Sequence, residues 1–149
     1  SSKQIRVPNG ASLDPQKEAE NYLIELNDSK GLGVQLLGLG VNGHIGFNEP
    51  NSAFNSSCRV VYLSNETKKQ NSFDFNNDLN KVPNCAITLG IADILAAEEI
   101  HLIVTGSSKA KIVRDFFTSP VSKDLPVSCL RGHKNLYIWL DIDAYKMMQ

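Results

Sequence analysis

The chain has 149 residues, of which 42% are hydrophobic and 21% are charged, and its formal net charge is −1. These values are ordinary for a globular protein and give no indication of a nucleic-acid-binding or acidic-membrane-binding surface. Cys58, Cys85 and Cys129 form no CxxC pair, which argues against a disulfide framework or a zinc site. No apolar run could span a membrane and the first residues do not resemble a signal peptide. We expect one cytoplasmic domain over residues 1–149, without nucleic-acid or membrane partners.

The N-terminal part of the chain predicts a helix followed by a strand. After an extended segment over residues 1–12, the pair Asp14-Pro15 has the pattern of a helix N-cap and first helical residue. Apolar side chains then recur at helical spacing, at Ala19, Tyr22, Leu23 and Leu26. The helix is expected to end within residues 27–31, and an apolar run over residues 33–39 predicts a buried strand.

The rest of the chain alternates between strands and helices. Strands are expected over residues 59–63, 100–104 and 136–140, and helical segments over residues 66–70, 86–97 and 108–117. Strands that are separated by helices pair in parallel through crossover connections. The sequence therefore predicts an α/β fold with a mostly parallel sheet.

The segment from Gly38 to Pro50 follows the first predicted strand and carries several functional groups. Gly38, Gly40 and Gly43 satisfy the pattern G-x-G-x-x-G, which in dinucleotide-binding proteins opens a helix. Here Gly46 and Pro50 follow within seven residues, and both residue types break helices. We therefore do not expect a nicotinamide cofactor.

His44 and Glu49 are the ionisable residues of this segment. An imidazole can move protons near neutral pH, and Glu49 could orient it or act as a second acid or base. The amide oxygen of Asn42 could accept a hydrogen bond from the ring and set its tautomer. The alternative is a structural loop histidine beside a solvated glutamate, but a glycine-rich turn at a strand end favours function. His101, within a predicted strand, is expected to be packed, and His133 is a weak candidate for the same rim.

The turn from Gly106 to Lys109 is a second candidate site, because it joins a predicted strand to a predicted helix. Free backbone N–H groups at a helix start, together with the Lys109 ammonium, would bind an anion. The alternative is an ordinary turn with a solvated lysine. If the strands are parallel, this turn and His44 lie at the same rim of the sheet. A proton-transfer group beside an anion site indicates a small phosphorylated metabolite.

Four segments of the chain resemble one known family. They are Asn42–Pro50 (NGHIGFNEP), Val82–Ile91 (VPNCAITLGI), Gly106–Ala110 (GSSKA) and Val127–His133 (VSCLRGH). The first resembles the signature of the glucosamine-6-phosphate deaminases, and the likeness extends from about residue 4 over nearly the whole chain. The resemblance implies a Rossmann-like three-layer α/β fold and conversion of glucosamine 6-phosphate to fructose 6-phosphate and ammonia. It implies no redox cofactor and no metal, a sugar-phosphate ligand, and a possible homo-oligomer.

The resemblance also implies roles for single residues. Those with implied roles in catalysis or substrate binding are Asn42, His44, Glu49, Lys109, Gly40 and Gly43. His44 would assist opening of the pyranose ring by proton transfer to the ring oxygen, and Glu49 would support it. Lys109 would hold the substrate phosphate. Asn42 stands where many members have Asp; an amide can orient the imidazole but lacks the charge that would stabilise its protonated form.

Three departures from the family pattern accompany this resemblance. The family's phosphate-binding arginine falls at Phe73 by simple count. Ser52 and Arg59 match the allosteric site, but Val61 stands at the position of a lysine, so allosteric activation is not assured. The family's phosphate loop and the Asp-Glu-Tyr segment that supplies the C2 base have no match in residues 1–32. We therefore expect the chain to be the C-terminal part of a deaminase, with little or no turnover by itself.

Two other functions remain open at this point. A 6-phosphogluconolactonase-like hydrolase would share the fold and the Gly-His turn, but it would continue with a Ser-Leu-Phe-Pro-like string instead of Gly46–Pro50. A sugar-phosphate sensor or inactive remnant would be consistent with Phe73 and with the unmatched C2 base.

Overall fold

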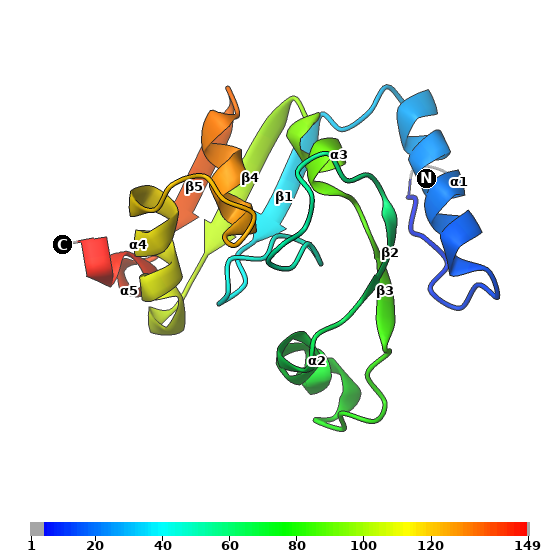
Figure 1. The fold of residues 1–149 in the computed structure, drawn as a ribbon, viewed down its shortest axis with the longest axis horizontal. Coiled ribbons are helices and arrows are strands. Elements are labelled where there is room, and N and C mark those ends of the chain that lie inside the picture. Colours follow the sequence, from blue (N-terminus) through cyan, green and yellow to red (C-terminus); the bar gives the residue numbers. More distant parts are fainter. Residues whose placement is uncertain (1–4, 149) are drawn as a thin grey trace.

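A computed structural model describes residues 5–148 of the chain, so residues 1–4 of the expected extended segment lie outside the described part (Figure 1). The α-helices are α1 (Pro15–Asp28), α2 (Asn65–Asn71), α3 (Ile91–Leu95), α4 (Ala110–Thr118) and α5 (Ile142–Tyr145). The strands are β1 (Val34–Gly38), β2 (Arg59–Tyr62), β3 (Cys85–Thr88), β4 (Glu99–Val104) and β5 (Leu136–Leu140). Short 3-10 helices are η2 (Ser72–Phe75), η3 (Ser107–Lys109), η4 (Pro126–Gly132) and η5 (Lys146–Met148). Within residues 5–148, no helix has the length and apolar character needed to cross a membrane.

The main sheet has the strand order β1-β4-β5, and both pairs are parallel. Leu102 on β4 lies opposite Leu37 on β1 and Ile138 on β5. A second, two-stranded sheet pairs β2 and β3 in antiparallel fashion. In Figure 1 this pair lies between the main sheet and α1 and leads to α2 at its far end. The expected α/β fold with a mostly parallel sheet is confirmed.

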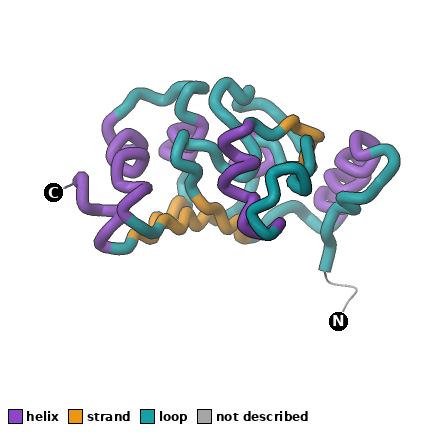
Figure 2. The backbone as a smooth tube through the Cα atoms, turned by 90° about the horizontal axis from the view of Figure 1, so that it is seen from below, coloured by secondary structure: helices purple, strands orange, loops and turns teal. Residues whose placement is uncertain are grey.

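One face of the main sheet carries the hydrophobic core. Figure 2 shows the helices and loops gathered on one side of its strands. The buried side chains on that side come from β1, β4, α4 and η4 and include Leu37, Ile100, Leu102, Val104, Ile112, Val113, Phe116, Val127 and Leu130. Alternate residues of the same strands, such as Leu36, Ile103 and Trp139, are exposed on the opposite face. The strict alternation along β4 follows from the period of two of a β-strand.

His101 lies on this exposed face, as a packed strand residue. Its ring stacks on Tyr137 with 4.8 Å between ring centroids. The indole Nε1 of Trp139 donates a hydrogen bond of 3.0 Å to Nδ1 of His101. The stacking is consistent with the expectation that His101 packs within the sheet and takes no part in proton transfer.

The start of α1 agrees with the sequence pattern. The Asp14 carboxylate accepts a hydrogen bond of 2.9 Å from the backbone N–H of Lys17, and Pro15 occupies the first turn, where its missing N–H is not needed. The helix ends at Asp28, within the expected range, and Lys30 and Gly31 follow with positive φ.

The expected helix over residues 86–97 is largely wrong. Residues 85–88 form β3, paired with β2, and only Ile91–Leu95 are helical. Gly90 separates the two elements, and its missing side chain matters because a Cβ there would lie 2.0 Å from the carbonyl oxygen of Ser56. The apolar residues of this segment have helical spacing. The β-branched residues Ile87 and Thr88 nevertheless pair in β3 with β2, a strand that lies more than twenty residues earlier in the chain.

Two isoleucines of β4 provide a matched test of this core. Ile100 is fully buried, whereas the Ile103 side chain is 47% exposed. Ile100→Ala is expected to lower the free energy of unfolding by about 2–5 kcal/mol, because it removes buried methyl groups and leaves a cavity. Ile103→Ala should lower it by less than about 1 kcal/mol. Urea unfolding followed by circular dichroism measures both, and equal losses would contradict the assignment of the buried face.

Candidate active site

The segment after β1 folds into tight turns that bring its polar residues together. The N–H of Gly43 donates to the carbonyl of Gly40 at 3.0 Å, and the N–H of Gly40 donates to the carbonyl of His44 at 2.9 Å. Gly43 has a φ of +86°, a conformation that side chains other than glycine rarely adopt. No helix begins at Gly43, in contrast to the dinucleotide-binding arrangement.

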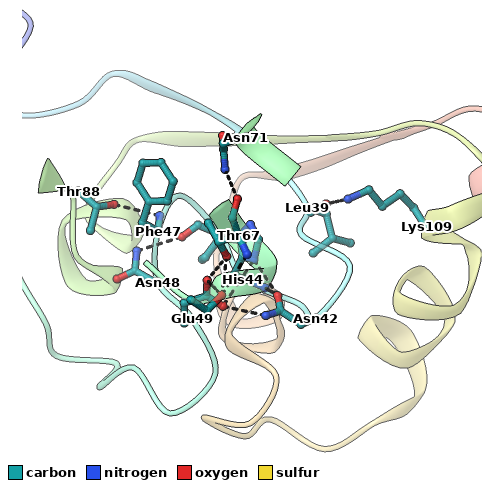
Figure 3. A network of polar contacts seen from close by, with 12 residues as sticks. Leu39, Asn42, His44, Phe47, Asn48, Glu49, Thr67, Asn71, Thr88 and Lys109 are labelled. Carbon is teal, nitrogen blue, oxygen red and sulfur yellow. Dashed lines mark hydrogen bonds and ion pairs between the residues drawn. The ribbon is translucent and has the colours of Figure 1, made fainter. Parts of the chain in front are cut away.

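Asn42, His44 and Glu49 form a hydrogen-bonded chain (Figure 3). Nδ1 of His44 lies 2.7 Å from Oδ1 of Asn42, and Nδ2 of Asn42 donates to Oε2 of Glu49 at 2.7 Å. A carboxylate can only accept, so the amide nitrogen must face Glu49 and the amide oxygen must face His44. An amide oxygen also only accepts, so Nδ1 of His44 carries the proton. The network therefore leaves Nε2 as the basic ring nitrogen for a bound molecule.

The second carboxylate oxygen of Glu49, Oε1, accepts hydrogen bonds from the first turn of α2 and its N-cap. Oε1 accepts a hydrogen bond from the hydroxyl of Thr67, and the Ser64 hydroxyl lies 3.2 Å from it. Neither residue was predicted from the sequence. Serine is a residue type that favours a helix N-cap, and Ser64 is the N-cap of α2. Nothing local in the sequence shows that this cap faces Glu49.

Burial and charge set the protonation of the pair. Burial lowers the pKa of His44 below its ordinary value, and the nearby Lys109 charge acts in the same direction, whereas Glu49 opposes both. For Glu49, burial alone would raise the pKa, but hydrogen bonds from Thr67, Asn42 and Ser64 and the charge of His44 outweigh it and lower the pKa. Near neutral pH the arrangement therefore consists of a neutral imidazole and a charged carboxylate, with Nδ1 of His44 3.8 Å from Oε2.

His44 and Lys109 line the same cavity, which has a volume of about 330 Å³. Its wall consists of Gly38, Leu39, Gly40, His44, Gly46, Phe47, Gln70, Asn71 and Lys109. Nζ of Lys109 donates to the carbonyl oxygen of Leu39 at 2.7 Å (Figure 3), and burial lowers the pKa of this ammonium group. The parallel sheet thus places both predicted groups at the carboxyl ends of the neighbouring strands β1 and β4, as expected from the sequence. Gln70 and Asn71, from α2, were not predicted.

The predicted anion site of free backbone N–H groups at the turn from Gly106 to Lys109 needs correction. The N–H of Gly106 donates to both oxygens of the Asp141 carboxylate, at 2.9 and 3.1 Å. The N–H of Lys109 donates to the carbonyl of Gly106 at 3.0 Å. The Asp141 charge also disfavours an anion beside the N–H of Gly106, whereas the Lys109 side chain carries a charge that attracts one. Asp141 follows β5 and caps α5, so its reach to Gly106 depends on the pairing of β4 with β5.

His133 does not belong to this rim. Its Nε2 lies 2.9 Å from the carbonyl oxygen of Ala97, just before β4 begins, so the ring lies at the amino end of the sheet. The expectation that it lines the same rim is wrong, because it precedes β5 whereas His44 follows β1. Among residues 5–148 there is also no group of three or more His, Cys, Asp or Glu side chains placed to hold a metal ion.

Comparison with known proteins identifies the family. Residues 1–139 match the family of glucosamine-6-phosphate isomerases and 6-phosphogluconolactonases. The chain belongs to this family. It is 43% identical over 141 residues to a glucosamine-6-phosphate deaminase of Bacillus pumilus, covering 95% of this chain and 58% of that relative. It is 42% identical over 138 residues to the deaminase of Pseudoalteromonas translucida, covering 93% of this chain and 51% of that one.

Solved structures of the family show the same architecture. A monomeric glucosamine-6-phosphate deaminase superposes with a TM-score of 0.95 at 35% identity, covering 99% of this chain and 61% of its own. The 6-phosphogluconolactonase of Trypanosoma brucei superposes with a TM-score of 0.66 at 22% identity, covering 99% and 59%, and supports the fold alone. The Rossmann-like α/β assignment is confirmed, whereas the third layer implied by the resemblance stays a prediction, because the helices and loops of residues 5–148 lie on one side of the main sheet (Figure 2). The chain spans about half the length of the curated relatives it matches.

Three further positions singled out by the family resemblance lie outside the hydrogen-bonded chain. Phe73, which stands at the family's arginine position, is in η2 and is 79% exposed. The N–H of Ser52 donates to the carbonyl of Glu49 at 3.0 Å, so Ser52 directly follows the segment that carries His44 and Glu49. Arg59 begins β2, and its Nη1 donates to the carbonyl of Ser57 at 3.3 Å. An allosteric role for Ser52 and Arg59 stays a prediction.

A substitution at Gly40 tests whether the turn sets the position of the imidazole. A Cβ at this position would lie 2.2 Å from Nδ1 of His44, so Gly40→Ala must displace the ring from Asn42. We expect the imidazole ¹⁵N chemical shifts of His44 to lose the signature of a fixed Nδ1–H tautomer. Gly38→Ala is the matched control, because a Cβ there meets nothing within 4 Å. Unchanged ¹⁵N shifts in a folded Gly40→Ala variant would contradict the described packing.

Proposed function

We propose that the chain supplies the ring-opening and phosphate-binding part of a glucosamine-6-phosphate deaminase, an enzyme that converts glucosamine 6-phosphate and water to fructose 6-phosphate and ammonia. The observation that carries this proposal is the oriented chain of His44, Asn42 and Glu49 on a cavity that also contains the Lys109 ammonium. The curated relatives described above are glucosamine-6-phosphate deaminases. Their name supports the choice of substrate.

His44 performs the first step in this proposal. Nε2 accepts the proton of the C1 hydroxyl and returns it to the ring oxygen as the bond between C1 and that oxygen breaks and the C1 carbonyl forms. The imidazole is positively charged in between. Glu49 stabilises that charge at 3.8 Å, while Asn42 keeps the ring fixed. The low pKa of His44 favours the neutral base that starts the step.

Lys109 binds the 6-phosphate in this proposal. Its present partner is a neutral carbonyl, that of Leu39, and a phosphate oxygen is a stronger partner because the hydrogen bond then joins two charged groups. A cavity of about 330 Å³ with both groups in its wall lies within the size range of small-molecule sites and suits a sugar phosphate. After ring opening, the C2 proton moves to C1 and an amine proton moves to O1, which gives a C1 hydroxyl and a C2 imine. Water then adds to C2 and ammonia leaves, so that C2 becomes the carbonyl of fructose 6-phosphate.

This reaction belongs to the metabolism of amino sugars, including the breakdown of N-acetylglucosamine. We propose a cytoplasmic location, because a sugar phosphate is charged and does not cross a membrane unaided. A homo-oligomeric state and a single domain over residues 1–149 stay predictions.

Ammonia release from glucosamine 6-phosphate, measured on the native protein at its natural length, tests the proposed reaction. His44→Gln should lower kcat at least about 100-fold, because it removes the base. His101→Gln is the matched control, since His101 packs on the exposed face of the sheet, and it should leave kcat unchanged.

Loss of rate on acidification should set in below about pH 6.5, because the pKa of His44 is lowered from that value. Hydrolysis of 6-phosphogluconolactone without ammonia release would overturn the proposal in favour of a lactonase.

Two lysines of one helical segment test the phosphate-binding role. Lys109→Met should weaken binding of glucosamine 6-phosphate about 10- to 100-fold, as expected for loss of a charge-assisted hydrogen bond. Lys111→Met is the control, because Lys111 is exposed and pairs with Asp115. Isothermal titration against glucosamine 6-phosphate and against unphosphorylated glucosamine gives the comparison. An equal effect of Lys109→Met on both sugars would exclude a contact to the phosphate.

A further inference from the structure

The helix α2 lies far from the glycine-rich turn in sequence but contacts its carboxylate. We propose that Thr67 is a positioning residue, whose buried hydroxyl fixes the Glu49 carboxylate and, through Asn42, the orientation and tautomer of His44. The geometry of residues 5–148 carries this inference. Its consequence for catalysis rests on the function proposed above.

Thr67 is itself held in place. Its side chain is only 1% exposed, and its hydroxyl donates to Oε1 of Glu49. Its backbone N–H donates to Oγ of Ser64 at 3.1 Å, and its carbonyl accepts a hydrogen bond of 2.8 Å from Nδ2 of Asn71. These two bonds hold the backbone of Thr67 and burial restricts its side chain, so the hydroxyl defines the place of the oxygen that it contacts.

The two oxygens of Glu49 are held from two different segments. Oε2 accepts from Asn42 in the turn after β1, and Oε1 accepts from Thr67 in α2. The terminal torsion of a glutamate side chain is soft, so one contact alone would not fix both oxygens. Without Thr67 the carboxylate could rotate away from Asn42, and the backbone N–H of His44, which donates to the amide oxygen at 3.2 Å, would be the remaining contact that holds the amide in its orientation.

Ser64 does not replace Thr67. Its single hydroxyl hydrogen can serve either Oε1 of Glu49, at 3.2 Å, or Oγ1 of Thr67, at 3.0 Å. The titratable groups that act on this network are His44, which acts on Glu49, and Lys109 and Glu66, which act on His44. None of these groups donates an uncharged hydrogen bond to Oε1 of Glu49, whereas the Thr67 hydroxyl does.

The same helix also contributes Gln70 and Asn71 to the cavity wall. One short element therefore both closes the cavity on one side and aligns the carboxylate. A displacement of α2 would disturb the substrate-facing wall and the tautomer of His44 together.

Nuclear magnetic resonance of the 149-residue chain without substrate tests the positioning role. Thr67→Val keeps the shape of the side chain and removes the donor. We expect it to raise the pKa of Glu49, followed by carboxyl ¹³C shifts, and to reduce the population of the Nδ1–H tautomer in the ¹⁵N shifts of His44. Thr67→Ser should restore both wild-type readouts. Thr118→Val is the matched control, because the Thr118 hydroxyl donates to the carbonyl of Arg114, on α4.

A folded Thr67→Val variant with wild-type Glu49 titration and His44 tautomer would overturn the proposal. If that variant does not fold, hydroxyl proton exchange in the wild-type chain tests the contact between Thr67 and Glu49. The Thr67 hydroxyl proton should exchange slowly with water and give a cross-peak to Glu49, and exchange as fast as that of an exposed hydroxyl would refute the contact. None of these readouts needs turnover, so absence of ammonia release would overturn the proposed function without affecting them.

Discussion

The Glu49 carboxylate can only accept hydrogen bonds, and the arrangement of the site follows from this constraint. The Asn42 amide must present its nitrogen to Glu49 and its oxygen to His44, which must then carry its proton on Nδ1. Uncharged donors around a part-buried carboxylate also keep it ionised, as its lowered pKa indicates. The backbone N–H of His44 donates to the Asn42 amide oxygen at 3.2 Å and favours the same orientation of the amide.

The parallel pairing of β1 with β4 is the second requirement, because it brings the two candidate groups to one rim. The turn after β1 carries His44, and the turn after β4 carries Lys109, which reaches back to the carbonyl at Leu39. An antiparallel pair would have placed these turns at opposite ends of the sheet. The core beneath α4 fixes this pairing by burying alternate residues of both strands, such as Leu37 and Leu102.

Local sequence patterns predicted those parts of the site whose interactions are short in range. The contact between Asn42 and His44 spans two residues, and the turn glycines and the cap of α1 are equally local. The anion site at Gly106 was predicted in part only, because the carboxylate of Asp141, 35 residues later, takes its backbone N–H. The helix expected over residues 86–97 proved largely wrong for the same reason, since a strand partner from 59–62 overrode the local spacing.

The sequence by itself determined the α/β class, the rim on which the chemistry lies, and the identity of the imidazole, carboxylate, amide and ammonium groups. Strand periodicity, helix caps and glycine turns are interactions between near neighbours, which the order of residues specifies directly. Only the tertiary structure decided that Thr67 and Ser64 donate hydrogen bonds to Glu49 and that Gln70 and Asn71 line the cavity. It also decided that the Asp141 carboxylate accepts a hydrogen bond from the N–H of Gly106. Those contacts join segments 15 to 35 residues apart, and their existence depends on packing that no local pattern encodes.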